Sequence, residues 1–164
     1  MQDELRSQQT TAPAGDLHRA DRARLRGAPG SPPVDTAFEC RVLRDGSRTL
    51  LHAAATSHLV STSMLEALFM TTSNPALQRL VAQNPRSPLW VIGEALHDDL
   101  DEVALAFYAR RMGRADLAYL LMEATAPGTT VAQRWQELGG GAVPSSEIRL
   151  SAGEHPGGGG GAPA

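Results

Sequence analysis

The sequence predicts an all-α fold, a short α-solenoid of about three helix pairs flanked by half-repeat caps. Apolar residues recur at a spacing of 27 positions, which brings Leu50, Leu77 and Ala104 into register. Start and stop signals for short helices are dense between these positions. A single pair of such helices cannot bury both of its faces, so each helix must stack on its sequence neighbour. We therefore expect one continuous core.

The two ends of the chain have a different composition from its middle. Residues 1–34 combine Gln, Thr, Ala, Pro, Gly and Arg without apolar periodicity, which predicts a disordered N-terminal arm. Residues 140–164 are rich in Gly and Pro, which predicts a flexible tail. The helical-repeat domain is expected over 35–139.

Helix boundaries inside the domain follow from capping residues. Thr36 and Glu39 have capping-box spacing, and Gly46 can end that helix. Ser47 can begin the next helix, and Ser63 with Glu66 repeats the capping-box spacing. The expected helices lie near 37–45, 48–57, 63–71, 75–83, 88–97, 100–112 and 115–124, with a last one from Thr129 or Thr130 to Leu138. An alternative β-hairpin over 37–51, turning at Asp45-Gly46, stays open.

Prolines at helix starts add to the evidence for helices in the middle of the chain. Asn74 can cap a helix with Pro75 at its first position, and Ser87 with Pro88 can do the same for the following helix. Asp98 and Asp99 lead into the next helix, which Gly113 closes. The repeat frame continues into the second helix of each unit, where it aligns Met64 with Val91 and Leu117, Leu65 with Ile92 and Ala118, and Leu68 with Ala95 and Leu121.

One unit of the repeat resembles a known family. It reads Asn74-Pro75, then Leu80-Val81-Ala82-Gln83-Asn84-Pro85-Arg86-Ser87-Pro88, then Val91-Ile92-Gly93-Glu94-Ala95-Leu96. This unit is similar to the leucine-rich repeat variant family. The resemblance implies a right-handed superhelix, similar to HEAT and armadillo arrays, that serves as a binding platform. It carries over no functional residue and no cofactor.

Composition narrows the kinds of partner. A net charge of −3 disfavours a sequence-independent nucleic-acid binder, because such proteins concentrate positive charge against phosphates. The single cysteine cannot form an intramolecular disulfide, so the sequence gives no sign of an oxidising compartment. The first residues lack the apolar run typical of a signal peptide, and no segment has about 20 apolar residues, so we expect a cytoplasmic protein that does not enter a membrane. Its expected role is a non-catalytic protein-interaction scaffold or adaptor with a protein partner that carries acidic groups.

Five residues are the expected binding residues. The repeat frame places arginines at the ends of first helices and in the turns that follow, where they would form one basic rim opposite an acidic rim of Asp98, Asp99, Asp101 and Glu102. Cations are also favoured at helix C-termini for structural reasons. Trp90 lies just inside a helix, where it can be an exposed anchor or pack on the neighbouring repeat. The expected binding residues are Arg86, Trp90, Arg110, Arg111 and Arg114.

Two alternatives to the scaffold remain open. A nucleic-acid-associated module would use the rim arginines together with Arg19, Arg22, Arg24 and Arg26 of the N-terminal arm as phosphate contacts. An enzyme would use Cys40, activated by His52 or His58, or the cluster of His97, Asp98 and Asp99, which could also suggest a metal. In structural terms, Cys40 is explained as an unreactive side chain, and Asp98 and Asp99 are explained as carboxylates that favour the start of a helix. No catalytic residue and no metal site is therefore assigned.

Overall fold

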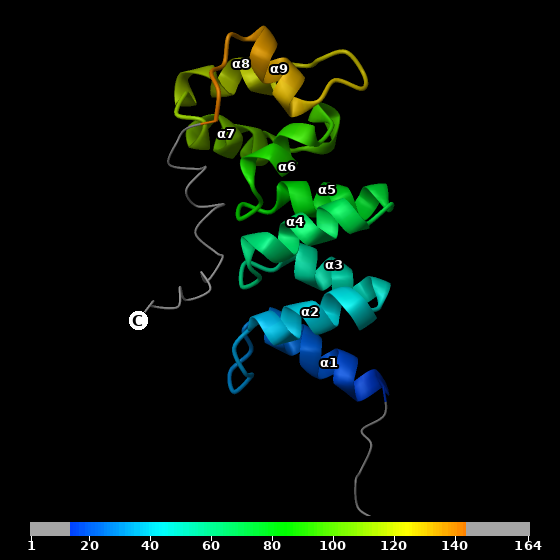
Figure 1. Cartoon of the computed structure of the whole chain (residues 1–164). Helices are drawn as coiled ribbons and strands as arrows, with labels where there is room; N and C mark the ends of the chain where they lie inside the picture. The colour runs from blue at the N-terminus through cyan, green and yellow to red at the C-terminus, as the bar shows by residue number, and fades with distance from the viewer. Residues whose placement is uncertain (1–13, 144–164) are drawn as a thin grey trace, which may run out of the picture.

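A computed structural model describes residues 14–143, apart from the side chains of residues 14, 16 and 17. This part of the chain is all-helical, which confirms the predicted fold class, and contains one isolated β-bridge but no strand. Figure 1 shows the helices lying one above another along the chain. They are α1 (Ala14–Leu25), α2 (Thr36–Asp45), α3 (Arg48–Thr56), α4 (Thr62–Thr71), α5 (Pro75–Gln83), α6 (Leu89–Glu94), the 3₁₀ helix η1 (His97–Asp99), α7 (Glu102–Arg111), the 3₁₀ helix η2 (Ala115–Leu117), α8 (Ala118–Met122) and α9 (Val131–Glu137).

Capping side chains begin most of these helices. Ser47 and Asn74 each accept a hydrogen bond from a backbone N–H in the first turn of α3 and α5, and Pro75 is the first residue of α5, as predicted. Thr130 and Gln133 form a reciprocal capping box at α9. Such a cap satisfies backbone donors that a helix start leaves without partners.

Two predicted caps are displaced, and a third acts differently. Asp35 caps α2 in place of Thr36, and Ser61 caps α4 in place of Ser63. Ser87 does not cap α6; its buried hydroxyl instead donates to the carbonyl of Val81 at 2.5 Å. Helix α6 starts after Pro88 without a side-chain cap.

Helices α2 and α3 rule out the alternative hairpin over 37–51. Residues 36–45 and 48–56 are helical, and Gly46 ends α2 by donating its N–H to the carbonyl of Val42 at 2.8 Å. Phe38, Glu39 and Val42 are the buried residues of α2, and their spacing of one, three and four positions follows a helical face rather than the alternation of a strand.

The prediction of a disordered arm is wrong from residue 14 onward. Residues 14–25 form α1, which packs on α3, and Leu25 is 2 % exposed. The carboxylate of Asp21 receives two hydrogen bonds from Arg41, both at 2.8 Å, and the hydroxyl of Ser57 donates to the carbonyl of Leu25 at 2.6 Å. Partners distant in sequence therefore stabilise a helix whose own composition is polar. Residues 1–13 of the predicted arm, like residues 144–164 of the predicted tail, lie outside the described residues.

The expected helix over 88–97 is shorter in the structure. It ends at Glu94, and the chain then pairs with the segment before α9, where the N–H of His97 donates to Thr129 and the N–H of Val131 donates to Ala95. The expected helix over 115–124 is likewise divided into η2 and α8. The backbone groups of Ala95 and His97 therefore bond to the segment before α9 instead of extending α6.

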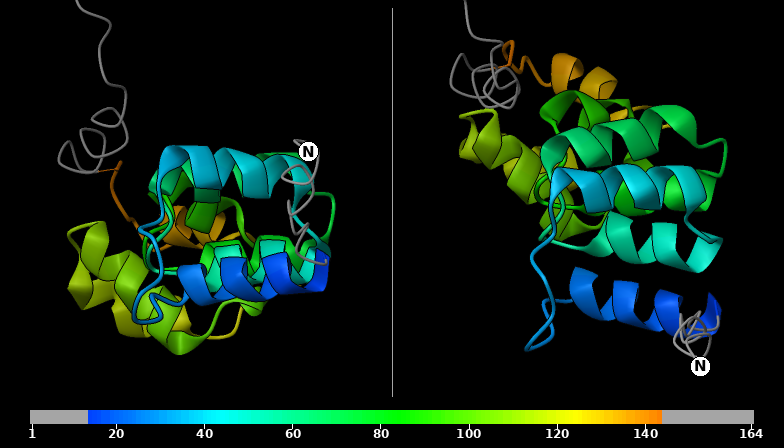
Figure 2. Two further views of the ribbon diagram at one scale, coloured as in Figure 1. Left: turned by 90° about the horizontal axis from the view of Figure 1, so that it is seen from below. Right: turned by 60° about the horizontal axis from the view of Figure 1, so that its bottom comes forward.

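The helices pack in two rows. Helix α3 contacts α1 and α5 in one row, and α2 contacts α4 in the other (Figure 2). Beyond α5 the packing changes, because α7 contacts α6, η2 and α8, while α9 lies on α6. The end of α9 is covered by glycines: Gly140 donates its N–H to the carbonyl of Trp135, and the indole N–H of Trp135 donates to the carbonyl of Gly141 at 3.0 Å.

The 27-residue spacing aligns some residues that are buried alike and others that are not. Ala54, Val81 and Tyr108, and likewise Ala55, Ala82 and Ala109, are each at most 4 % exposed. Leu50 and Leu77 are also buried, whereas the aligned Ala104 is only half-buried. Two apolar clusters result, one from Leu25 to Val91 and one from Ala82 to Trp135, and they meet at α5 and α6.

Candidate basic edge

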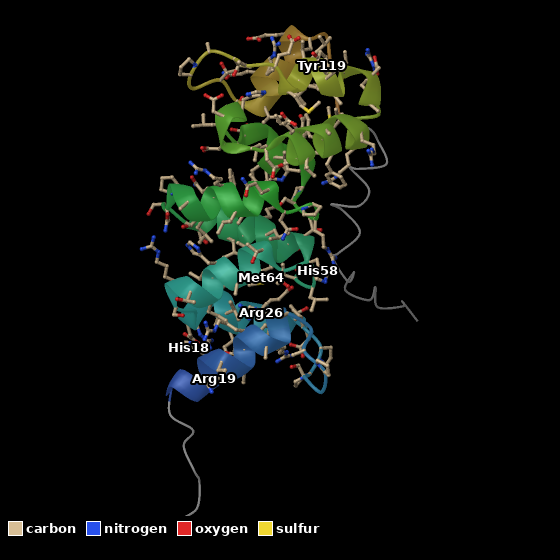
Figure 3. The ribbon with its side chains drawn as sticks, turned by 180° about the vertical axis from the view of Figure 1, so that it is seen from behind. His18, Arg19, Arg26, His58, Met64 and Tyr119 are labelled. Atoms are coloured by element: carbon tan, nitrogen blue, oxygen red, sulfur yellow. The ribbon has the colours of Figure 1, made fainter. Side chains whose placement is uncertain are left out.

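The turns after α1, α3, α5 and α7 lie along one edge of the stack. Figure 1 shows them on the left, whereas the connections after α2, α4, α6 and α8 lie on the right. Five arginines and one histidine lie on the left-hand turns and helix ends, and we call this surface the basic edge; Figure 3 labels two of its residues. The basic edge consists of Arg26, His58, Arg86, Arg110, Arg111 and Arg114.

Each turn of the basic edge is joined to the one before it by side-chain hydrogen bonds. Ser57 reaches back to Leu25. The buried amide of Asn84 donates to the carbonyls of Ala55 and Ser57 at 2.8 and 2.9 Å. Arg111 donates to the carbonyl of Ser87 at 2.6 Å. These bonds link four successive turns and hold their exposed side chains in a fixed order.

The three residues that make these bonds lie at the C-terminal ends of α3, α5 and α7. Ser57, Asn84 and Arg111 are each 27 positions apart, which is the period of the apolar pattern. Sequence reasoning did not use this signal, because serine, asparagine and arginine share no obvious chemistry at the end of a helix. In the structure they share one role, since each donates to carbonyls of the preceding turn.

The predicted binding arginines divide into two groups. Arg111 is half-buried, lies 5.6 Å from the ring centroid of Phe107 and donates to backbone carbonyls, so its guanidinium is committed to the fold. Arg114 pairs with Asp116 at 2.7 Å, and this hydrogen bond holds the pKa of Asp116 below its usual value. Within residues 14–143, by contrast, the exposed side chain of Arg110 makes no hydrogen bond or ion pair.

Arg86 and Arg26 are the other two exposed arginines of the basic edge that make no ion pair within residues 14–143. One guanidinium nitrogen of Arg86 donates to the carbonyl of His58 at 2.9 Å, and the residue remains exposed. Arg26, which follows α1, is exposed and has no ion-pair partner in the described part of the chain. Asp35 and Asp116 pair with Arg24 and Arg114, and the buried carboxylate of Glu39 accepts from the N–H and the hydroxyl of Ser61 in the turn after α3. Arg26, Arg86 and Arg110 make no ion pair within residues 14–143.

Trp90 packs on a neighbouring helix and is also partly exposed. Its ring lies edge-on to Phe69 of α4, with centroids 5.8 Å apart, yet the residue is 37 % exposed. It therefore packs on the neighbouring helix with one face and leaves part of the indole at the surface.

The arginines of α1 do not form one cationic arm. Arg24 pairs with Asp35 at 3.2 Å, and its guanidinium lies 4.1 Å from the ring centroid of Phe38. Arg19 is exposed on the same helix, whereas Arg26 belongs to the basic edge (Figure 3). The four arginines named for a phosphate contact therefore lie on α1 or directly after it.

The predicted acidic rim lies at the opposite edge, but it is partly paired. The connection from α6 to α7 carries Asp98, Asp99 and Asp101 on the right in Figure 1. Asp99 pairs with Arg79 of α5 at 2.6 Å, and Asp101 caps α7 through the N–H of Ala104. The structural role expected for carboxylates at a helix start is therefore present.

The residues considered for catalysis are dispersed. Cys40 is exposed on α2. His97 is buried, with Nε2 at 2.5 Å from the carbonyl oxygen of Leu121 and Nδ1 at 3.6 Å from Asp98. Among residues 14–143, no three His, Cys, Asp or Glu side chains are grouped so that they could hold a metal ion. A pocket between α1, α2 and α3 contains His18 and Asp45, but its central charges, Asp21 and Arg41, bind each other.

Comparison with known proteins gives no match. No family model matches the sequence, and no curated protein or solved structure matches it significantly. The similarity of residues 74–96 to the leucine-rich repeat variant family therefore stays a prediction. No helix within residues 14–143 is long and apolar enough to cross a membrane.

Proposed function

We propose that this chain is a non-catalytic protein-interaction scaffold that binds a partner protein in the cytoplasm through its basic edge. In this proposal the helices form a short right-handed solenoid of the HEAT or leucine-rich-repeat-variant type. The observation that carries it is a set of exposed arginines that make no ion pair within residues 14–143: Arg26, Arg86 and Arg110. They lie in or next to turns that side-chain hydrogen bonds join to one another.

The fixed order of the turns favours binding. Ordering a loop upon association costs free energy, and a surface that is already held by internal bonds avoids part of that cost. Asn84 and Arg111 hold the turns through backbone carbonyls, so the neighbouring exposed arginines need not be repositioned. A preorganised row of charges also speeds encounter with a partner of opposite charge.

The repeat geometry supports the solenoid part of the proposal. The C-terminal ends of α3, α5 and α7 make the same kind of backward hydrogen bond, and two sets of aligned residues are buried alike. Stacked units of this kind expose an extended surface made from equivalent positions, which suits recognition of another macromolecule.

The test compares two charge reversals in the full chain. The double variant Arg26→Glu/Arg110→Glu changes the basic edge without removing a hydrogen bond of the described fold. The matched control, Arg19→Glu/Arg48→Glu, changes two arginines that are exposed elsewhere. Each tagged protein is used for affinity capture from extract of the native cell, and the captured proteins are compared by mass spectrometry.

The proposal expects the wild type and the control to capture the same partner and the edge variant to lose it. All three proteins should have the same far-ultraviolet circular dichroism, which excludes unfolding as the cause. If the edge variant retains every partner at the same salt dependence as the wild type, the basic edge is not the binding surface and the proposal fails.

A further inference from the structure

Helix α7 carries apolar side chains on the side that faces away from the core. Leu105 and Ala109 are buried on its inner side. On the opposite side, Val103 is 77 % exposed, and Ala106 and Phe107, three and four positions further along, are half-buried. We call Val103, Ala106 and Phe107 the α7 stripe, because residues at this spacing share one face of a helix. The exposure of Val103 shows that no other part of residues 14–143 covers this face.

The first helices of the preceding pairs do not have this apolar face. The positions that the 27-residue spacing aligns with Val103 and Ala106 are Thr49 and His52 in α3, and Ala76 and Arg79 in α5. These are polar or small side chains, as is usual on a solvated helix face. Helix α7 also differs in position, because it packs on α6, η2 and α8, and Figure 2 shows it displaced to one side of the rows formed by α1 to α5. The packing of the array therefore does not explain the α7 stripe.

Opposite charges flank the α7 stripe. Glu102 begins α7 and Arg110 lies near its end, so their α-carbons are about 12 Å apart along the helix axis. Both residues are exposed, and neither side chain makes a hydrogen bond or ion pair within the part of the chain that the structure describes. This face of α7 is therefore acidic at its start, apolar in its middle and basic at its end.

We infer that two copies of this chain associate through α7, with the two helices antiparallel and the two α7 stripes in contact. A two-fold axis then passes close to Ala106, and each copy offers the same surface to the other. Glu102 of each copy faces Arg110 of the other. Because Ala106 is small, the two helix axes can approach to about 8 Å. Val103 and Phe107 bury apolar surface on either side of the axis.

A second copy fits this face better than a partner of uniform charge. An acidic segment would be attracted by Arg110 but repelled by Glu102 at the other end of the α7 stripe, and a basic segment would meet the reverse problem. The antiparallel copy pairs both charges and covers the apolar residues between them. One face of a ten-residue helix is smaller than the about 800 Å² per partner of a standard interface, so we expect a dissociation constant between micromolar and millimolar.

Sedimentation velocity of the full chain tests self-association over protein concentrations from about 10 µM to about 1 mM. A reducing agent is present, because Cys40 is exposed and two copies could otherwise form a disulfide. The wild type should change from monomer to dimer over this range. Val103→Arg should remain monomeric, because each new arginine would face Arg110 of the other copy. Met70→Arg is the matched control: Met70 is 68 % exposed on α4, so this variant should dimerise like the wild type.

Exchange of the two charges tests the antiparallel orientation. Glu102→Arg and Arg110→Glu should each weaken self-association at least about fivefold, because like charges then meet at both ends of the contact. An equimolar mixture of these two variants should associate again, since every arginine then faces a glutamate. The double variant Glu102→Arg/Arg110→Glu should associate by itself for the same reason. Circular dichroism verifies that every variant is folded.

Two sets of results overturn the inference. A wild type that stays monomeric over the whole range excludes self-association. Dimerisation of Val103→Arg as tight as that of the wild type, or a mixture of the charge variants that associates no better than either alone, excludes the contact through α7. Arg110 belongs to both this contact and the basic edge, but Val103→Arg keeps every arginine of that edge. Capture of a partner from cell extract by Val103→Arg therefore tests the proposed function independently of self-association.

Discussion

Asn84 is expected to be one of the costliest polar residues to replace in this chain. It lies at the end of α5 and is 4 % exposed. Its amide nitrogen donates to the carbonyls of Ala55 and Ser57, and its amide oxygen accepts from the N–H of Arg86 at 2.9 Å. Alanine at this position would leave two carbonyls of a preceding buried turn without donors.

The magnitude follows from the number of bonds and their burial. A hydrogen bond contributes about 0.5–1.5 kcal/mol net, and a buried group left without a partner costs about 1–3 kcal/mol. Ala55 is fully buried and Ser57 is 5 % exposed, so water cannot readily replace both donors. Asn84→Ala should therefore destabilise the fold by about 3 kcal/mol. Asn74→Ala is the control, because Asn74 makes one cap bond at a partly exposed helix start, worth about 1 kcal/mol.

Urea unfolding followed by far-ultraviolet circular dichroism measures both variants against the wild type. The expected order is wild type, then Asn74→Ala, then Asn84→Ala, with the second loss about three times the first. Asn84→Asp keeps the acceptor for Arg86 but removes both donors, so it should be at least as unstable as Asn84→Ala. If Asn84→Ala proves no less stable than Asn74→Ala, the buried bonds between turns do not hold the stack.

Three further predictions concern other parts of the fold. Trp135→Ala should lower the free energy of unfolding by about 3–5 kcal/mol in the same urea assay, because Trp135 is 2 % exposed against Tyr108; a loss under about 1 kcal/mol would contradict this packing. Hydrogen bonds from Arg41 lower the pKa of Asp21 from 3.8, so their stabilisation is present above that pH and is lost as pH falls through the folded-state pKa. Asp21→Asn should therefore be about 1 kcal/mol less stable than wild type at neutral pH, and the difference should disappear in acid unfolding experiments. Burial raises the pKa of Tyr108 from 10.0, so phenolate absorbance in Tyr119→Phe should appear only above that pH, and sooner once the protein unfolds.

Local signals explain why most helices could be predicted. Ser47, Asn74 and Thr130 act on backbone groups two or three residues away, so sequence spacing alone reveals their role. The 27-residue spacing of apolar residues also predicted the shared burial of Ala54, Val81 and Tyr108, but not that Ala104 is only half-buried. Where two candidates lie close together, as with Ser61 and Ser63, spacing could not choose between them.

Long-range contacts explain what sequence reasoning missed. Helix α1 is polar by composition, and its place in the stack depends on Leu25, on the pair between Asp21 and Arg41, and on the bond from Ser57. None of these partners is close in sequence. The same limit applies to the candidate site. Arg26 was expected in the N-terminal arm and not on this edge, and the commitment of Arg111 to carbonyls of another turn was not predicted.

The bonding residue changes with the packing of the helix whose end carries it. Ser57 acts where α3 packs directly on α1, and Asn84 acts where α5 packs directly on α3. Helix α7 instead contacts α6 and α8, and the long side chain of Arg111 at its end donates to the carbonyls of Pro85 and Ser87 in the turn after α5. The last step of the basic edge is therefore held by a guanidinium from the edge itself, whereas the exposed side chain of Arg110 makes no hydrogen bond or ion pair within residues 14–143.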